Sequence, residues 1–311
     1  MLKVSLRQIG YFVAAAETGS IAEAARIAGV AQPSVSWAIL KMEEVLGVDL
    51  LVRHHAKGVS LTAAGHRLLP EARAILRMAE EFEASASSEA NELTGTLSVG
   101  CYSTLAANFM PPIIAEFARR HPRLHIEMLE STVDDVLARL AGGEIEIALA
   151  YDVDLPPDVL KRHICSSAPY VLLCEGHRML DHPALSLRDL ADEPFILLNS
   201  RPAKQYFLGL FEAVGIEPRI VHASPSFEVV RSLVGQGLGY SVLITRSPSD
   251  MTYDGLRVRH RALTDELPRQ SMCTVRAAGS RATRRANAFQ EICVELFSGR
   301  SDPVRAVSSR T

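Results

Sequence analysis

The sequence predicts an α/β protein with an N-terminal winged helix-turn-helix, a long dimerisation helix and two doubly wound α/β lobes. Three observations support this class. A helix–turn–helix pattern occupies residues 20–47, apolar residues recur at spacings of three and four over residues 62–88, and strand patterns alternate with helix patterns from residue 95 onward. Such alternation is typical of parallel sheets covered by helices.

Residues 20–47 carry the end signals of two short helices joined by a tight turn. Ser20 and Glu23 have the S-x-x-E spacing of a capping box, which satisfies free amides at a helix start. Gly29 stands where a left-handed residue ends a helix, and Pro33 lies in the first turn of the next helix. The second helix has one apolar stripe, predicted to face a core: Val35, Ile39, Met42 and Leu46. A helix-turn-helix of this kind places its second helix in the major groove of DNA.

The flanking residues extend this module to residues 1–61. An earlier helix is predicted from Leu6 to about Thr18, with an apolar stripe of its own: Leu6, Ile9, Val13 and Ala16. After Gly47, a short apolar run, a basic tip, a turn at Gly58 and a second apolar run predict a β-hairpin wing. The alternative for this segment is a plain helical bundle with an alanine-rich hairpin, because helix-turn-helix patterns alone are not specific.

Four residues on the outer face of the second helix are predicted to contact bases. The amide of Gln32 and the hydroxyl of Ser36 suit hydrogen bonds to base edges. Pro33 and Trp37 offer apolar surface to thymine methyl groups.

A second set of four residues is predicted to contact the DNA backbone. Lys41 on the helix, and Arg53 and Lys57 on the wing, are expected to neutralise phosphates. Ser34 is expected to donate a hydrogen bond to one phosphate. Because the net charge of the chain is −3, affinity is expected from these placed contacts, multiplied by dimerisation, and not from a cationic surface.

Five motifs follow one another along the N-terminal segment: Leu6-Arg7-Gln8-Ile9, Ala22-Glu23-Ala24-Ala25, Gln32-Pro33-Ser34-Val35-Ser36, Glu43-Glu44-Val45-Leu46-Gly47 and Leu61-Thr62-Ala63-Ala64-Gly65. Together they give the chain a resemblance to the LysR-type transcriptional regulators. Gly95-Thr96-Leu97 and Gly235-Gln236-Gly237-Leu238-Gly239 extend it over nearly the whole chain. Trp37 departs from the family pattern, which usually has a polar or basic residue there, and Leu51 and Glu146 are packing variants of the usual Phe and Asp.

Residues 62–90 are predicted to form a linker and dimerisation helix. Its apolar seam covers nearly four heptads and includes five residues assigned to a dimer contact: Leu69, Ala72, Ile75, Leu76 and Phe82. A lone helix cannot bury such a seam, so a homodimer is expected. The alternative is that the helix packs on its own domain.

Residues 91–311 are predicted to form the effector-binding domain. The resemblance implies two lobes joined by crossover strands, as in periplasmic binding proteins, with an inducer in the cleft between them. Lobe I is assigned to residues 91–161 and 266–300, and lobe II to residues 162–265. The last helix is expected to return to lobe I.

Polar residues follow several predicted strands, where doubly wound sheets bind ligands. Hydroxyls at a helix N-terminus favour an anion, and Arg201 suits a carboxylate. The predicted effector contacts match the cleft-lining positions of the family fold: Tyr102, Ser103, Thr104, Thr132, Tyr151, Ser200, Arg201 and Phe227. They indicate a small organic acid, and Asp152 argues against a phosphate ester. The alternative is that the hydroxyls are ordinary helix caps.

Other features exclude several classes of protein. No dinucleotide-binding glycine pattern, P-loop or nucleophile elbow is present, so an enzyme and a bound cofactor are not expected. The five cysteines are odd in number and lack C-x-x-C spacing, so neither a metal site nor a disulfide framework follows. Cys101 is the one cysteine for which a functional role stays open, because it ends a strand beside the predicted effector site. No signal peptide or membrane span is apparent, which predicts a cytoplasmic protein.

The resulting interpretation is a sequence-specific regulator of transcription that responds to a small molecule. Its expected partners are promoter DNA, the effector, further copies of itself in a homodimer or homotetramer, and RNA polymerase as a further candidate. The alternative is a ligand-independent or thiol-responsive regulator of the same fold.

Overall fold

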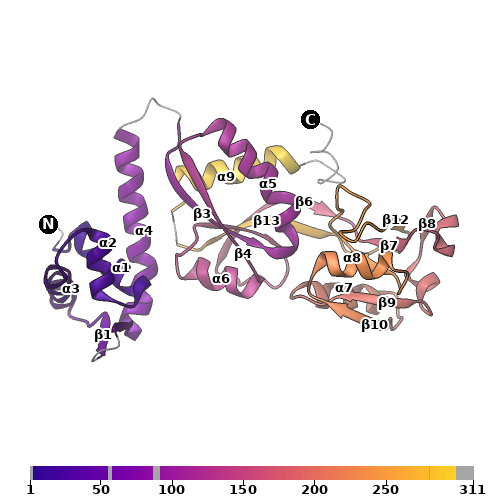
Figure 1. Cartoon of the computed structure of the whole chain (residues 1–311), viewed down its shortest axis with the longest axis horizontal. Coiled ribbons are helices and arrows are strands. Elements are labelled where there is room, and N and C mark those ends of the chain that lie inside the picture. The colour runs from indigo at the N-terminus through magenta and orange to yellow at the C-terminus, as the bar shows by residue number, and fades with distance from the viewer. Residues whose placement is uncertain (1–2, 55–57, 87–91, 280, 299–311) are drawn as a thin grey trace.

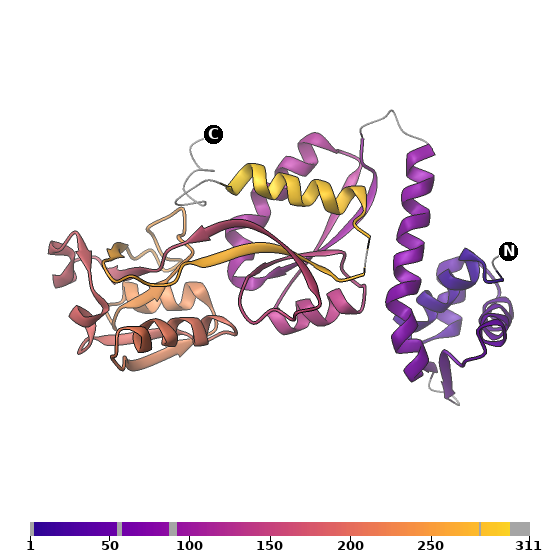
Figure 2. The ribbon, with the colours of Figure 1, turned by 180° about the vertical axis from the view of Figure 1, so that it is seen from behind.

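The structure, a computed structural model, describes residues 3–54, 58–86, 92–279 and 281–298. The molecule is elongated: the helix-turn-helix lies at one end, followed by a long helix, lobe I and lobe II (Figures 1 and 2). The predicted α/β class and the order of its parts are confirmed. None of the described helices combines the length and apolarity that a membrane span requires.

The N-terminal domain is a three-helix unit with a two-stranded wing. Its elements are α1 (Leu6–Thr18), α2 (Ile21–Ala28), α3 (Gln32–Leu46), β1 (Leu51–His54) and β2 (Gly58–Leu61). The wing strands pair antiparallel, with Leu51 opposite Leu61. Gly29 adopts the left-handed conformation after α2, as its position predicted. The local signals of the sequence therefore located every element of this domain.

Three details of this domain differ from the sequence prediction. Leu6 and Leu46, assigned to apolar stripes, are exposed, whereas Phe12 is completely buried in the core. The predicted capping box at Ser20 is only half formed. Ser20 Oγ accepts from the Glu23 amide at 3.2 Å, but the Glu23 carboxylate turns to Arg26 at 2.6 Å. An arginine one turn on gives that carboxylate a charged partner, which it prefers to a backbone amide.

The long helix α4 (Ala63–Ala86) buries part of its apolar seam within its own domain. Leu69 and Ala72 belong to the core formed with α1, and Leu76 packs partly against it. Leu69 and Ala72 are therefore covered by their own domain and not by a partner, whereas the dimer contact of the half-buried Leu76 stays a prediction. Ile75 and Phe82, with side chains 44% and 77% exposed, remain free for a partner.

Lobe I contains a five-stranded sheet in the order β4–β3–β5–β13–β6. The strands are β3 (Gly95–Tyr102), β4 (Leu124–Ser131), β5 (Ile147–Tyr151), β6 (Val159–Ser167) and β13 (Gln270–Ala277). β3 runs parallel to β4 and β5, whereas β13 runs antiparallel to β5 and β6. The expectation of parallel sheets therefore holds for the first three strands and is wrong for the crossover strands.

Three helices cover this sheet: α5 (Ser103–Arg120), α6 (Val133–Ala141) and α9 (Arg284–Phe297). Along β5, Ile147 and Leu149 join the core under α5 and α9, and Ala148 and Ala150 join the core under α6. This alternation follows from the two-residue period of a strand. The last helix packs on lobe I, as expected (Figure 1).

Lobe II is a smaller α/β unit. Its strands are β7 (Tyr170–Cys174), β8 (Ala184–Leu185), β9 (Pro194–Leu198), β10 (Arg219–Ser224), β11 (Ser241–Leu243) and β12 (Val258–Leu263). Its helices are α7 (Ala203–Ala213) and α8 (Phe227–Gly235), with the 3₁₀ turns η1 (Arg178–Asp181) and η2 (Leu187–Leu190). β11, β7, β12 and β8 form one sheet, and β9 and β10 form a parallel pair joined to it by a bridge from Phe195 to Tyr240.

Gly239 is required where β11 approaches β9. Its φ is 155°, and a Cβ at this position would lie 2.3 Å from the carbonyl oxygen of Pro194. We expect Gly239→Ala to lower the free energy of unfolding by about 3 kcal/mol, because the backbone there cannot yield. Thermal or denaturant unfolding measures this loss. Gly209→Ala, in α7 with open space around it, is the control and should be neutral or stabilising; equal losses would contradict the argument.

Candidate nucleic-acid interface and effector cleft

The outer face of α3 is largely exposed in the described chain. Figure 1 shows α3 at the end of the molecule that points away from the two lobes. Gln32, Pro33, Ser34 and Lys41 are exposed and Ser36 is half-buried. Trp37 is 62% exposed. A tryptophan left in water is a hydrophobic surface without a partner, so its exposure favours a contact with another molecule.

The basic residues near α3 form ion pairs of different strength. Lys41 Nζ lies 2.5 Å from Glu44, but both side chains are exposed, so the pair is weak and Lys41 can turn to a phosphate. Arg53 lies 3.5 Å from the buried Glu43, which holds it at the base of the wing. Lys57, the third predicted phosphate contact, lies outside the described residues.

Sequence reasoning missed Glu43, which connects the recognition helix to the wing. Its side chain is only 5% exposed, and Oε1 accepts hydrogen bonds from the amides of Leu50 (2.8 Å) and Leu51 (3.0 Å). Glu43 lies four residues after Ile39, on the buried stripe of α3. A carboxylate at that spacing was the available signal, because a buried charge needs a structural reason.

Two tyrosines cross the boundary between the lobes. The Tyr102 hydroxyl lies 2.8 Å from the Ser200 hydroxyl, and the Tyr151 hydroxyl lies 2.5 Å from the hydroxyl of Thr245. The two rings make an edge contact with centroids 6.0 Å apart. Burial raises the pKa of both tyrosines, so they remain neutral hydrogen-bonding groups. Thr245 was not predicted, because it follows no strand–helix boundary.

Thr104 contributes a polar atom that its neighbours leave unsatisfied. Its Oγ1 is buried beside the two tyrosines and forms no hydrogen bond of normal geometry within the described part of the chain. Ser103, the first residue of α5, is half-buried next to it. A buried hydroxyl without a partner costs about 1–3 kcal/mol, which a ligand could recover.

The other predicted effector residues have protein partners. Arg201 Nη1 lies 3.4 Å from Asp134 of lobe I, and both side chains are more than 60% exposed. Thr132 caps α6 by accepting from the Asp135 amide at 3.3 Å, which is the ordinary capping role. Phe227 packs on the core of lobe II beneath the guanidinium of Arg231.

The structure also bears on two other expectations from the sequence, one about the charge of Asp152 and one about the cysteines. Lys161 lies 2.6 Å from Asp152, so this aspartate has a partly exposed cationic partner, which weakens its argument against a phosphate ester. Burial raises the pKa of Cys165 to about 11 and of Cys273 to about 12, and it also raises the pKa of Cys101 and Cys293. In the described residues no three His, Cys, Asp or Glu side chains gather as a metal site would require.

An exposed recognition helix with a wing, followed by two α/β lobes, defines a DNA-binding regulator with an attached sensor module. The family model described as "Bacterial regulatory helix-turn-helix protein, lysR family" matches residues 6–66. The model described as "LysR substrate binding domain" matches residues 90–298. The chain therefore belongs to the LysR family of transcriptional regulators.

Three similar proteins illustrate the relationship. The uncharacterised regulator YvbU of Bacillus subtilis is 30% identical over 298 residues, which cover 94% of this chain and 99% of that protein. The crystal structure of HinK, a LysR family regulator from Pseudomonas aeruginosa, shares 37% identity and a TM-score of 0.64, covering 94% of this chain and 98% of that one. The hydrogen peroxide-inducible genes activator of Pectobacterium carotovorum is 27% identical over 255 residues, covering 81% and 84%.

Proposed function

We propose that this LysR-family regulator binds a small organic acid between its two lobes and that the bound acid changes its affinity for promoter DNA. The observation that carries the proposal is the unsatisfied hydroxyl of Thr104 beside Tyr102 and Tyr151, at the start of α5. The N-terminus of this helix favours a negative charge. Arg201 can leave its exposed partner Asp134 for a carboxylate, because such surface pairs are weak.

The bound acid acts only through its different affinities for the arrangements of the lobes. We propose that α6 transmits this difference. Near its N-terminus Asp134 faces Arg201 of lobe II, and beyond its C-terminus two carbonyl groups contact α4. Gly142 O accepts from Arg73 at 2.6 Å, and Gly143 O accepts from Arg77 at 2.8 Å. Movement of α6 on closure of the cleft would therefore displace α4 and the helix-turn-helix that it carries.

The thiol-responsive alternative receives less support, although one similar protein is named as a hydrogen peroxide-inducible activator. A reactive cysteine must be an accessible thiolate. Four of the five cysteines are buried with raised pKa values, and Cys174 is the half-buried exception. A ligand-independent regulator remains the other alternative.

Thermal unfolding of the full chain with a panel of small carboxylates tests the proposal. At a hundredfold excess over its dissociation constant, a ligand adds about 2.7 kcal/mol to stability. The shift should disappear in Ser103→Ala and Arg201→Ala and persist in Arg219→Ala, which alters an exposed arginine of lobe II. A ligand whose shift survives both cleft substitutions would disprove the assigned site.

Trp37, the only tryptophan of the chain, reports on the proposed DNA contact. With an operator selected from a random DNA pool, we expect its emission to change and its quenching by iodide to fall. Binding covers a side chain that is 62% exposed in the free protein. Trp37→Phe removes the signal and serves as the blank. Unchanged quenching at saturating DNA would exclude Trp37 from the interface.

The proposed assembly is a homodimer, and a homotetramer of two dimers, held partly by the exposed stripe of α4. Met78, 47% exposed, lies between Ile75 and Phe82 in this stripe at spacings of three and four. Acting on promoters places the protein in the cytoplasm and makes RNA polymerase a candidate partner.

A further inference from the structure

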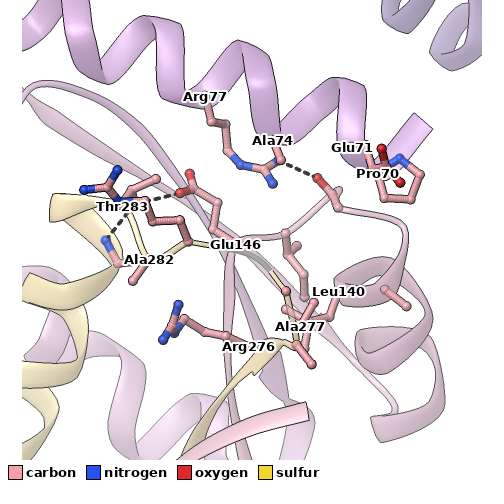
Figure 3. Close-up of a pocket in the computed structure, with 17 residues that line it drawn as sticks. Pro70, Glu71, Ala74, Arg77, Leu140, Glu146, Arg276, Ala277, Ala282 and Thr283 are labelled. Atoms are coloured by element: carbon pink, nitrogen blue, oxygen red, sulfur yellow. Dashed lines mark hydrogen bonds between the residues drawn. The ribbon is translucent and has the colours of Figure 1, made fainter. Parts of the chain in front are cut away.

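A cavity of about 360 Å³ lies between α4 and lobe I, away from the cleft described above. One wall is α4, and the others are the end of α6, the start of β5 and the segment from β13 to α9. Figure 3 shows Arg77 reaching from α4 toward lobe I, with Glu146 and Thr283 on the facing side. Small-molecule sites range over about 300–1,000 Å³ and often lie at domain boundaries, as this cavity does.

Cationic side chains from both walls line the cavity. Arg77 comes from α4, and Arg276 and Arg281 come from lobe I. The guanidinium of Arg77 donates to Gly143 O at 2.8 Å, but no carboxylate of the described chain forms an ion pair with it. Desolvation lowers the pKa of Arg77, and the nearby Glu146 only partly offsets this effect. The cation on α4 is therefore incompletely compensated.

The buried carboxylate nearest to Arg77, that of Glu146, already has hydrogen-bond partners of its own. Glu146 accepts from Arg285 at 3.0 Å and from the Thr283 hydroxyl at 2.9 Å. The other lining carboxylate, Glu71, is exposed. Arg281 is exposed, and its side chain has no ion-pair partner among the described residues. The cavity thus retains two guanidinium groups without carboxylate partners, one on each side of a domain boundary.

The start of α9 also lines the cavity, and its first amide, that of Arg284, already donates to the Glu81 carboxylate of α4. Thr283 caps this 14-residue helix by accepting from the Ala286 amide, and both residues line the cavity. The N-terminus of a helix carries about half a positive charge. Guanidinium groups pair in bidentate fashion with carboxylate and phosphate oxygens.

We propose that this cavity is a second effector site, which binds a small oxyanion carrying a carboxylate or phosphate group. An anion that bridges Arg77 of α4 and Arg281 of lobe I would hold the linker helix against the lobe. The site would therefore influence the DNA-binding domain directly, without closure of the cleft between the lobes.

Calorimetric titration of the full chain with inorganic phosphate and with malonate, at constant ionic strength, tests this site. We expect saturable binding of one anion per chain, weakened about tenfold in both Arg77→Gln and Arg281→Gln. Binding should be unchanged in Arg67→Gln, an exposed position of α4 that does not line the cavity. Preference for either anion supports the site and identifies its chemical class.

Two outcomes would overturn the proposal. Weak binding without saturation, equal in all variants, would mean an adventitious ion only. Binding lost in Arg201→Gln but kept in Arg281→Gln would place the anion in the cleft, which leaves the proposed function intact and removes the second site. Because Arg281 is exposed, its variant should fold even if Arg77→Gln does not.

Discussion

Glu43→Ala is expected to lower the free energy of unfolding of the DNA-binding domain by about 3 kcal/mol and to abolish specific DNA binding. The amides of Leu50 and Leu51 would lose their shared acceptor in a place that water does not reach, because Leu50 and Leu51 are buried. Arg53 would also lose the carboxylate that holds it beside the wing. The wing would then lose its fixed position relative to α3.

Denaturant unfolding and operator titration together measure this effect. The matched control is Glu44→Ala, because Glu44 is the next residue and its carboxylate makes only an exposed pair with Lys41. Glu43→Gln should retain most of the stability, since an amide oxygen can accept both hydrogen bonds. Equal behaviour of Glu43→Ala and Glu44→Ala would refute the structural role of the buried carboxylate.

The second large effect is expected in the double variant Arg73→Ala, Arg77→Ala, which should release α4 from lobe I. Arg73 is nearly buried, with 10% of its side chain exposed. Besides Gly142 O, it contacts Glu17 of α1 at 3.0 Å and Glu144 of lobe I at 3.8 Å. Charged hydrogen bonds of this kind contribute about 1.5–3 kcal/mol each, so their loss should shift the docking equilibrium at least about tenfold.

Hydrogen exchange of the full chain reports this release. Amides 142–146 and those of α4 beyond Pro70 should exchange about tenfold faster in the double variant. Arg67→Ala, on the exposed face of the same helix, should leave exchange unchanged. If the double variant still binds both DNA and the effector, but the effector no longer changes its affinity for DNA, α6 is the transmitting element. An effect of the effector on DNA affinity as large as in the unaltered protein would exclude α6 as that element.

The helix-turn-helix could be located from sequence because its signals are local. A serine or proline at a helix start and a glycine at its end act through the backbone within one turn. The apolar stripe of α3 likewise follows from the period of the helix, although its last member, Leu46, lies beyond the core. The strands β6 and β12 escaped prediction because polar residues interrupt them: VLKRHICSS and VRHRAL.

The sites were less accessible to sequence reasoning, because their partners are distant in the chain. Tyr102 could be placed at a strand end, but its pairing with Ser200 spans 98 residues. Arg201 carried the expected charge, but its partner Asp134 became apparent only when the two lobes were placed side by side. Arg77 looked like an ordinary surface residue of a long helix until lobe I covered it.

By itself, the sequence determined the class of the protein, the order of its domains and the exposed face of α3 that we propose meets DNA. Those properties depend on capping, periodicity and turn chemistry, which act over a few residues. Only the tertiary structure decided which side of α4 is buried, which hydroxyl at the cleft lacks a partner and which arginines join the linker helix to lobe I. These features depend on desolvation and on long-range contacts, whose energies are set by groups that the chain brings together only on folding.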